Sequence, residues 1–220
     1  WETAAHRALA NNSVSYTERP DIETFMREWT ALVESKSGER GIFNREASKK
    51  QAAKFGRRDP NFEFGTNPCS EIILRPYQFC NLTEVVVRAT DTVDDLERKV
   101  KLATILGTVQ SSFTKFPYLR KVWQRNTEEE RLLGVSLTGI MDNKLLTTKN
   151  KGLEETLEHL REVAVHTNND YANRLGIPQS TSITCVKPSG TVSQLVDSAS
   201  GIHARHSRYY VRTVRGDNKD

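Results

Sequence analysis

The sequence predicts an α/β fold built from buried strands and the helices that connect them. Residues 80–87 end in a run of three valines, and a β-branched run of this kind favours a buried strand. From Asp91 or Thr92 to about Phe113, apolar residues recur at the spacing of a long helix. A buried strand followed at once by such a helix is typical of a βαβ unit. The helix residues predicted to face the core are Leu102, Ile105, Leu106, Val109 and Phe113.

The composition is that of an ordinary globular segment, because 36% of the 220 residues are hydrophobic and 27% are charged. No apolar run approaches about 18 residues, so we expect no membrane span. Trp1 begins the chain without an initiator Met or a signal-peptide pattern, which indicates an internal fragment of a longer protein. Three cysteines with no Cys-x-x-Cys pair predict reduced thiols, a cytoplasmic location and no metal site.

The net charge of +4 and the isoelectric point of about 9.0 leave two kinds of partner open. A mildly basic chain suits a polyanionic small substrate and equally a nucleic-acid surface. Residues 45–58 carry six basic side chains and one acidic one, and they indicate an exposed basic helix. A solvated face is the preferred interpretation, because few aromatic residues for base stacking are interleaved with these charges.

The first 44 residues predict two helices and a short strand. Residues 1–10 favour a helix that ends at Asn11-Asn12, and a second helix begins at Pro20-Asp21. Residues 41–44 indicate a short buried strand. In the second helix a stripe at i, i+3, i+4, i+7 spacing predicts a core face. That stripe consists of Ile22, Phe25, Met26, Trp29, Leu32 and Val33.

The second half of the chain predicts two more helices and two more strands. Thr127-Glu128-Glu129-Glu130 has the pattern of a capping box, which predicts the start of a helix. Residues 152–173 predict another helix, which ends before Gly176-Ile177-Pro178. Residues 182–186 and the end of the block 201–212 indicate strands. The inward face of the 152–173 helix consists of Leu153, Leu157, Leu160 and Ala164.

Residues 67–74 carry the most reactive combination of side chains in the chain. Asn67, Cys69 and Glu71 alternate, so an extended segment would send an amide, a thiol and a carboxylate to one face. Two flanking prolines cannot donate to a sheet ladder, which favours a loop with Cys69 near its tip. A possible base then lies beside a sulfur nucleophile or radical. The plainer interpretation is that the cysteines are small buried hydrophobes and Glu71 is a surface acid.

Residues 187–195 form a second candidate site. The predicted strand at 182–186 runs into Pro188, Ser189, Gly190 and Thr191, where a helix is expected to start. A strand, a glycine-containing turn and a helix start direct free N–H groups and the positive end of a helix dipole at one spot. The segment therefore predicts a phosphate-binding loop.

Three separated blocks of the sequence resemble the ribonucleotide reductases. The first is Asn67-Pro68-Cys69-Ser70-Glu71-Ile72 with Cys80-Asn81-Leu82, and the others are residues 134–140 and residues 187–195 with 199–203. The spacing of eleven positions from Cys69 to Cys80 is similar to that of the monomeric, adenosylcobalamin-dependent ribonucleoside-triphosphate reductases. The resemblance implies that residues 1–220 belong to the catalytic domain, a ten-stranded α/β barrel. A finger loop at about 65–82 would occupy its centre, beside a phosphate loop at about 187–195.

The resemblance also implies roles for the residues of the finger loop. With adenosylcobalamin as cofactor, Cys69 would carry a thiyl radical and abstract the 3′ hydrogen of the ribose. Glu71 would accept the 3′-hydroxyl proton as general base, and Asn67 would orient Glu71 and the substrate hydroxyls. Cys80 would be one of two reducing thiols, with its partner lying upstream of Trp1. Cys185 is in an apolar context, which favours an inert buried thiol.

The partners implied by the same resemblance are small molecules and a redox protein. Pro188, Ser189, Gly190 and Thr191 would hold the phosphates of a ribonucleoside triphosphate. Thioredoxin or a similar dithiol would act as reductant, and a deoxynucleotide effector would bind outside this chain. We expect no membrane association and no stable nucleic-acid complex.

Two other functions remain open from the sequence. Tyr209-Tyr210 could relay a radical from another subunit, as in the large subunit of an iron-dependent ribonucleotide reductase. Adjacent tyrosines in a strand face opposite sides, however, and usually only pack. The chain could also be a non-catalytic nucleic-acid-binding module that uses the basic residues of 45–58 and 205–215. His203 and His206 are spaced for a metal pair on a helix, but their neighbours do not favour a helix.

Overall fold

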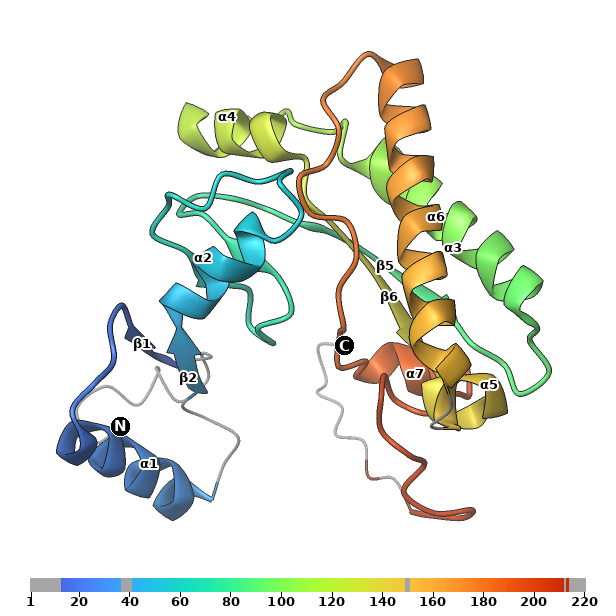
Figure 1. The fold of residues 1–220 in the computed structure, drawn as a ribbon, viewed down its shortest axis with the longest axis horizontal. Coiled ribbons are helices and arrows are strands. Elements are labelled where there is room, and N and C mark those ends of the chain that lie inside the picture. The colour runs from blue at the N-terminus through green and yellow to red at the C-terminus, as the bar shows by residue number, and fades with distance from the viewer. Residues whose placement is uncertain (1–12, 37–40, 149–150, 212, 214–220) are drawn as a thin grey trace, which may run out of the picture.

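The structure is a computed structural model, and it describes residues 13–36, 41–148, 151–211 and 213. Two parallel strands, β5 (Asn81–Val86) and β6 (Leu133–Thr138), run side by side at its centre (Figure 1). The segment 182–186 extends this sheet beyond β6, because Leu133 and Val135 donate their N–H groups to the carbonyls of Ser182 and Ile183. The strand expected near 80–87 is therefore confirmed as β5, and the segment 182–186 runs parallel to β6 through a single bridge at Thr184, with β6 between the two.

Two long helices cover one face of this sheet (Figure 1). They are α3 (Val93–Gln110), which follows β5, and α6 (Lys151–Leu175), which precedes the 182–186 segment. A parallel strand pair needs a crossover connection, and α3 with α4 (Lys121–Glu130) supplies it between β5 and β6. The α/β prediction is confirmed. The core between helices and sheet includes Val85, Leu96, Val100, Leu133, Val135, Leu160, Ala164 and Ile183.

Helix α3 begins where the sequence predicts but buries a different face. Thr92 caps it, and Thr92 and Asp95 form a reciprocal capping box. The predicted core residues Leu102, Leu106 and Phe113 are exposed instead. The buried face consists of Leu96, Val100, Ala103, Thr104, Gly107 and Thr108. Small side chains on this face allow close packing, since a Cβ added at Gly107 would lie 3.4 Å from Leu133 Cδ2.

The N-terminal elements lie away from the central sheet (Figure 1). Strands β1 (Ser13–Tyr16) and β2 (Gly41–Asn44) pair in parallel, and α1 (Ile22–Ser35) connects them with Asp21 as its N-cap. The predicted start of α1 is confirmed, but no described residue of α1 is buried. The stripe that includes Met26 and Trp29 is thus uncovered rather than core. The helix expected at 1–10 lies outside the described residues.

Two other predictions are wrong. Thr127–Glu130 forms the last turn of α4 rather than the start of a helix, and Arg131 follows in the left-handed conformation. The capping-box pattern failed here because Glu130 is engaged by buried cations outside its own helix. The described residues of 201–212 also form no strand. By contrast, α6 buries Leu160 and Ala164 as expected and ends at Gly176 with φ 66°, although Leu157 is exposed.

The remaining elements are short and surround the candidate site. They are α2 (Arg45–Ala53), β3 (Gly65–Thr66), β4 (Ile73–Leu74), the 3₁₀ turn η2 (Ile140–Asp142), α5 (Lys144–Thr147) and α7 (Thr191–Leu195). Among the described residues, no helix combines the length and apolarity required to span a membrane.

Candidate active site

The finger loop, residues 65–82, begins as a hairpin whose two arms are β3 and β4. Between the arms, Ser70 donates its N–H to the carbonyl of Asn67 at 3.0 Å and has a positive φ of 62°. The side chain of Asn67 accepts the N–H of Ile72 at 3.0 Å and closes the turn. The segment is therefore a turn, which agrees with the loop favoured by the sequence, and the single shared face that an extended segment would give to Asn67, Cys69 and Glu71 does not form. Cys69 is exposed near the tip, as expected.

The base of the finger loop is fixed by a buried ionic network. Arg58 forms two hydrogen bonds to Glu130, at 2.9 and 2.8 Å, and both residues are almost completely buried. Gln78 donates to Glu130 at 2.6 Å, and Arg75 lies 3.1 Å from it. Arg58 also donates to the carbonyl of Ile73 in β4. The expectation that residues 45–58 form one exposed basic helix is wrong, since α2 ends at Ala53 and Arg58 anchors the loop.

Near the tip, Glu71 turns inward while Cys69 faces solvent. The Glu71 side chain is fully buried, and its Oε1 accepts a hydrogen bond from Lys187 Nζ at 2.8 Å. Its Oε2 is also buried and accepts no hydrogen bond within the described residues. Burial alone would raise the pKa of Glu71, but the hydrogen bond from Lys187 lowers it, and the nearby backbone and the polar side chain of Asn67 add to this, so that the pKa is lowered overall. Glu71 is therefore an ionised carboxylate with one oxygen engaged.

The two other thiols lie in the same electrostatic environment. Burial raises the pKa of Cys80, and the charge of Glu71 raises it further while Lys187 opposes the change. The same groups, again led by burial, raise the pKa of Cys185 to about 12. Cys185 is thus a neutral thiol at physiological pH, consistent with the inert role expected of it.

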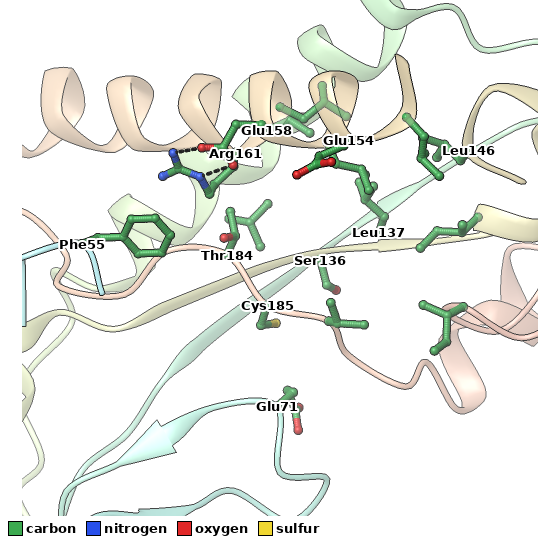
Figure 2. A pocket seen from close by; sticks show the side chains of 18 of the residues that line it. Phe55, Glu71, Ser136, Leu137, Leu146, Glu154, Glu158, Arg161, Thr184 and Cys185 are labelled. Carbon is green, nitrogen blue, oxygen red and sulfur yellow. Dashed lines mark hydrogen bonds and ion pairs between the residues drawn. The ribbon is translucent and has the colours of Figure 1, made fainter. Parts of the chain in front are cut away.

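Alternating side chains divide the sheet into two faces (Figure 2). Leu137 and Thr184 point toward α6, whereas Ser136 and Cys185 point toward the finger loop that carries Glu71. Gly134, two residues before Ser136 in β6, has no side chain and so leaves room on this second face for its neighbours. A Cβ at Gly134 would lie 2.4 Å from Leu82, 2.8 Å from Ile72 and 3.1 Å from Cys185 Sγ. The absence of a side chain there lets the finger loop pack directly on the sheet.

The predicted phosphate loop, residues 187–195, lies against the finger loop. Lys187 connects the two through Glu71, and two residues later Ser189 donates its hydroxyl to Glu84 Oε2 at 3.1 Å. Gly190 precedes α7, as the predicted helix start requires, and α7 has no side-chain cap. Ser189 is buried, and its hydroxyl proton is already used by Glu84. The backbone N–H groups at Gly190 and Thr191 are therefore the better candidates for an anion.

A cavity of about 940 Å³ is lined by residues of the central sheet, α6 and the finger loop (Figure 2). Its lining includes Glu71, Ser136 and Cys185, and on the α6 side Phe55, Leu137 and Arg161. A volume of this size lies within the range of small-molecule sites. The described residues contain no cluster of three or more His, Cys, Asp or Glu side chains arranged to hold a metal ion. His203 and His206 are both exposed.

The structure thus unites most of the residues selected from the sequence and adds two that were missed. Asn67, Glu71 and Cys80 share one environment with the loop at 187–195. The additions are Lys187 and Glu84, which bind Glu71 and Ser189 respectively. Glu84 could have been found as the acidic residue within an otherwise β-branched strand, and Lys187 as the cation that precedes the predicted turn.

Comparison with curated proteins gives related sequences over almost the whole chain. An adenosylcobalamin-dependent ribonucleoside-triphosphate reductase from Lactobacillus delbrueckii subsp. bulgaricus is 28% identical over 251 aligned residues, which cover 98% of this chain and 32% of that protein. A probable reductase of the same name from Dictyostelium discoideum is 34% identical over 158 residues, which cover 69% of this chain and 19% of that protein. This chain thus spans about a third of the length of the first of these relatives.

The fold has a solved counterpart. The crystal structure of a B12-dependent, class II ribonucleotide reductase matches with a TM-score of 0.71 and 27% sequence identity. The match covers 92% of this chain and 31% of that one. No family model matches the chain.

Proposed function

Because the chain is homologous over 98% of its length to adenosylcobalamin-dependent ribonucleoside-triphosphate reductases, we propose that its protein reduces ribonucleoside triphosphates to 2′-deoxyribonucleotides. The observation that carries this proposal is the finger loop itself. An exposed thiol, Cys69, and a buried ionised carboxylate, Glu71, lie two residues apart beside a loop suited to phosphate. The parallel strands around them are proposed to form part of a ten-stranded α/β barrel.

The residues of the tip fit the chemistry that the cofactor implies. Adenosylcobalamin, when bound, supplies the radical that removes a hydrogen atom from a thiol. Cys69 is the exposed thiol of the finger loop and fits that exchange, whereas Cys185 is only partly exposed and is turned toward the loop. In the proposed reaction Cys69 takes the 3′ hydrogen of the ribose. Glu71 receives the 3′-hydroxyl proton, and Asn67 orients both.

Replacement of the 2′-hydroxyl by hydrogen, with release of water, requires two electrons and two protons. Cys80 is proposed to supply them together with a second thiol outside this chain, and the two become a disulfide. The raised pKa of Cys80 keeps its proton available for transfer. A thioredoxin-type dithiol would then restore the thiols in the cytoplasm, and a deoxynucleotide effector would bind elsewhere in the protein. The proposed function involves no complex with nucleic acid.

The segment Pro188–Thr191 is proposed to hold the substrate phosphates. Ser189 is tied to Glu84, so the loop is held in one shape before an anion arrives. The backbone N–H groups at its helix start provide donors that require no side-chain charge. In this proposal the phosphates bind at one end of the site and Glu71 lies at the other, and the contact of Lys187 with Glu71 supports it because it joins the two loops.

The test compares three cysteine variants of the complete protein with ribonucleoside triphosphate, adenosylcobalamin and a dithiol. Cys69→Ser should abolish both turnover and loss of 3′-tritium from labelled nucleotide, because an O–H bond is too strong for the carrier role. Cys80→Ser should keep 3′-tritium loss and release free base, since the reducing thiol is missing. Cys185→Ser is the matched control and should retain turnover.

Two results would contradict the proposed function. If the Cys69→Ser and Cys80→Ser proteins both fold and keep wild-type turnover, these two cysteines have only a packing role. Activity that requires an iron-bearing second subunit instead of adenosylcobalamin would favour the iron-dependent class and a role for Tyr209-Tyr210.

A further inference from the structure

Lys187 occupies the junction of the two loops that form the site. It is the first residue of the phosphate loop, and its Nζ lies 2.8 Å from Glu71 Oε1. The ammonium-bearing side chain is 27% exposed, while the carboxylate it holds is 0% exposed. Its backbone is closely packed as well, because a Cβ added at Gly201 would lie 2.8 Å from the Lys187 carbonyl oxygen. The backbone from which the Lys187 side chain reaches Glu71 is therefore fixed in position.

Glu71 depends on this contact more than on any other. A buried carboxylate without a counterion is strongly disfavoured, and Lys187 is the cation bonded to it. The other groups that face Glu71 are the neutral amide of Asn67 and the thiols Cys80 and Cys185. Hydrogen bonding to Glu71 in turn raises the pKa of Lys187, so both partners remain charged.

The two carboxylate oxygens are thereby made unequal. Oε1 accepts the bond from Lys187, whereas Oε2 is buried and has no hydrogen-bond partner within the described residues. An oxygen that is desolvated but unbonded retains its capacity to accept a proton or a hydroxyl hydrogen bond. This difference follows from the position of Lys187 alone.

We propose that Lys187 is a positioning residue, which holds Glu71 through Oε1 so that Oε2 is the atom that receives the substrate's hydroxyl proton. The inference rests on the proposed function and deepens it. Because Lys187 is covalently continuous with Pro188, it also sets the distance between the phosphate loop and the base. Substrate bound by its phosphates is then presented to Oε2 at a fixed separation.

The experiment uses the complete protein with Lys187→Met, Lys187→Arg and a matched control, Lys99→Met. Lys99 has a comparable half-buried ion pair, 2.5 Å from Asp91, on the far side of the sheet. Lys187→Met should lower kcat by about 10- to 100-fold with a smaller change in KM, because the base is misplaced while phosphate contacts persist. Lys187→Arg should restore much of kcat, and Lys99→Met should leave it unchanged.

The pH profile provides the second readout. A base acts in its ionised form, and Lys187 lowers the pKa of Glu71, so removal of Lys187 should move the acid limb of kcat to higher pH. The Glu71 carboxyl band, assigned by infrared difference with Glu71→Gln, should titrate at higher pH in Lys187→Met even without turnover. Lys99→Met should shift neither.

Three outcomes would overturn the proposal. They are an unshifted Glu71 titration in Lys187→Met, a change confined to KM, and an arginine variant no better than methionine. Failure of the proposed function is seen separately, as a wild-type protein that reduces no ribonucleotide under any of these conditions. The infrared titration still decides whether Lys187 holds Glu71 in that case.

Discussion

The finger loop is held by two buried carboxylates that differ in how completely they are bonded. At its base, Glu130 receives hydrogen bonds from Arg58 and Gln78 and an ion pair from Arg75. Near its tip, Glu71 receives one side-chain hydrogen bond, from Lys187, and its Oε2 accepts none within the described residues. Both side chains are hidden from solvent, so burial does not distinguish them.

The difference separates a fully bonded carboxylate from the one that we propose is reactive. Three donors, from the loop after α2 and the finger loop, fix both oxygens of Glu130, which lies at the end of α4, so the contacts hold three segments together. A carboxylate saturated in this way has no free capacity to accept a proton. Glu71 keeps that capacity, and a half-bonded buried carboxylate near a cavity is characteristic of a functional site.

The largest effect is expected when the reactive carboxylate is neutralised. Glu71→Gln keeps the shape of the side chain and removes the base, so turnover should fall by about 10²- to 10⁴-fold. Stability should change little, because glutamine is neutral and Lys187 is partly exposed. The measurement is kcat in parallel with denaturant unfolding of the complete protein. Glu129→Gln, which changes a half-exposed carboxylate, is the control. An equal loss of turnover in both variants would mean that Glu71 has no special role as a base.

The next effect is expected on stability, at the base of the finger loop. Arg58→Met removes the ion pair between Arg58 and the buried Glu130. Breaking such a buried pair lowers the free energy of unfolding by about 3–5 kcal/mol. Arg98→Met removes an exposed ion pair with Asp95 and should cost about 0–1 kcal/mol. Urea unfolding of the two variants measures the difference. Equal values would mean that the network at Glu130 does not hold the loop.

The sequence predicted the elements of this region better than their contacts. The strand at 80–87 and the helix after it could be anticipated from a β-branched run and helical spacing, but β6, which contacts both β5 and the segment 182–186, was not predicted. A loop with Cys69 near its tip could be predicted, but the turn at Asn67–Ser70 that directs Glu71 inward could not, because residue spacing alone does not distinguish an extended segment from a folded one. The exchange of the α3 faces has a similar cause. Both stripes of α3 have helical spacing, and only close packing on α6 selects the smaller one.

The two ion pairs escaped prediction for a different reason. Arg58 with Glu130 and Lys187 with Glu71 join residues that are 72 and 116 positions apart. No local pattern couples residues at such a separation, so a charged residue looks like a surface residue until its partner is known. The contact of Lys187 with Glu71 and the burial of Arg58 are therefore findings of the three-dimensional structure.

A smaller effect is expected where the finger loop packs on the sheet. Gly134→Ala places a Cβ against the ends of Leu82 and Ile72, both flexible side chains, and overpacking of this kind costs about 1–3 kcal/mol. Gly65→Ala, in β3, meets nothing within 4 Å and should be close to neutral. Because Ile72 adjoins Glu71, the Gly134 variant should also lower kcat in proportion to displacement of the loop. A destabilised variant with unchanged kcat would show that the tip is positioned by Lys187 alone.

The smallest effect is expected at Cys185, which borders Glu71 without taking part in the proposed chemistry. Its pKa of about 12 leaves a thiolate fraction at pH 8 of about 10⁻⁴, some thousandfold below that of an unperturbed thiol. Alkylation at pH 8 should therefore modify Cys185 far more slowly than Cys69, which is exposed. Peptide mapping after timed alkylation of the complete protein gives the two rates. A fast reaction of Cys185, or a disulfide between Cys185 and Cys80 during turnover, would instead show that a partly buried thiol beside Glu71 is reactive. The difference between the fully bonded Glu130 at the base of the loop and the partly bonded Glu71 near its tip would then have no counterpart in the reactivity of the thiols.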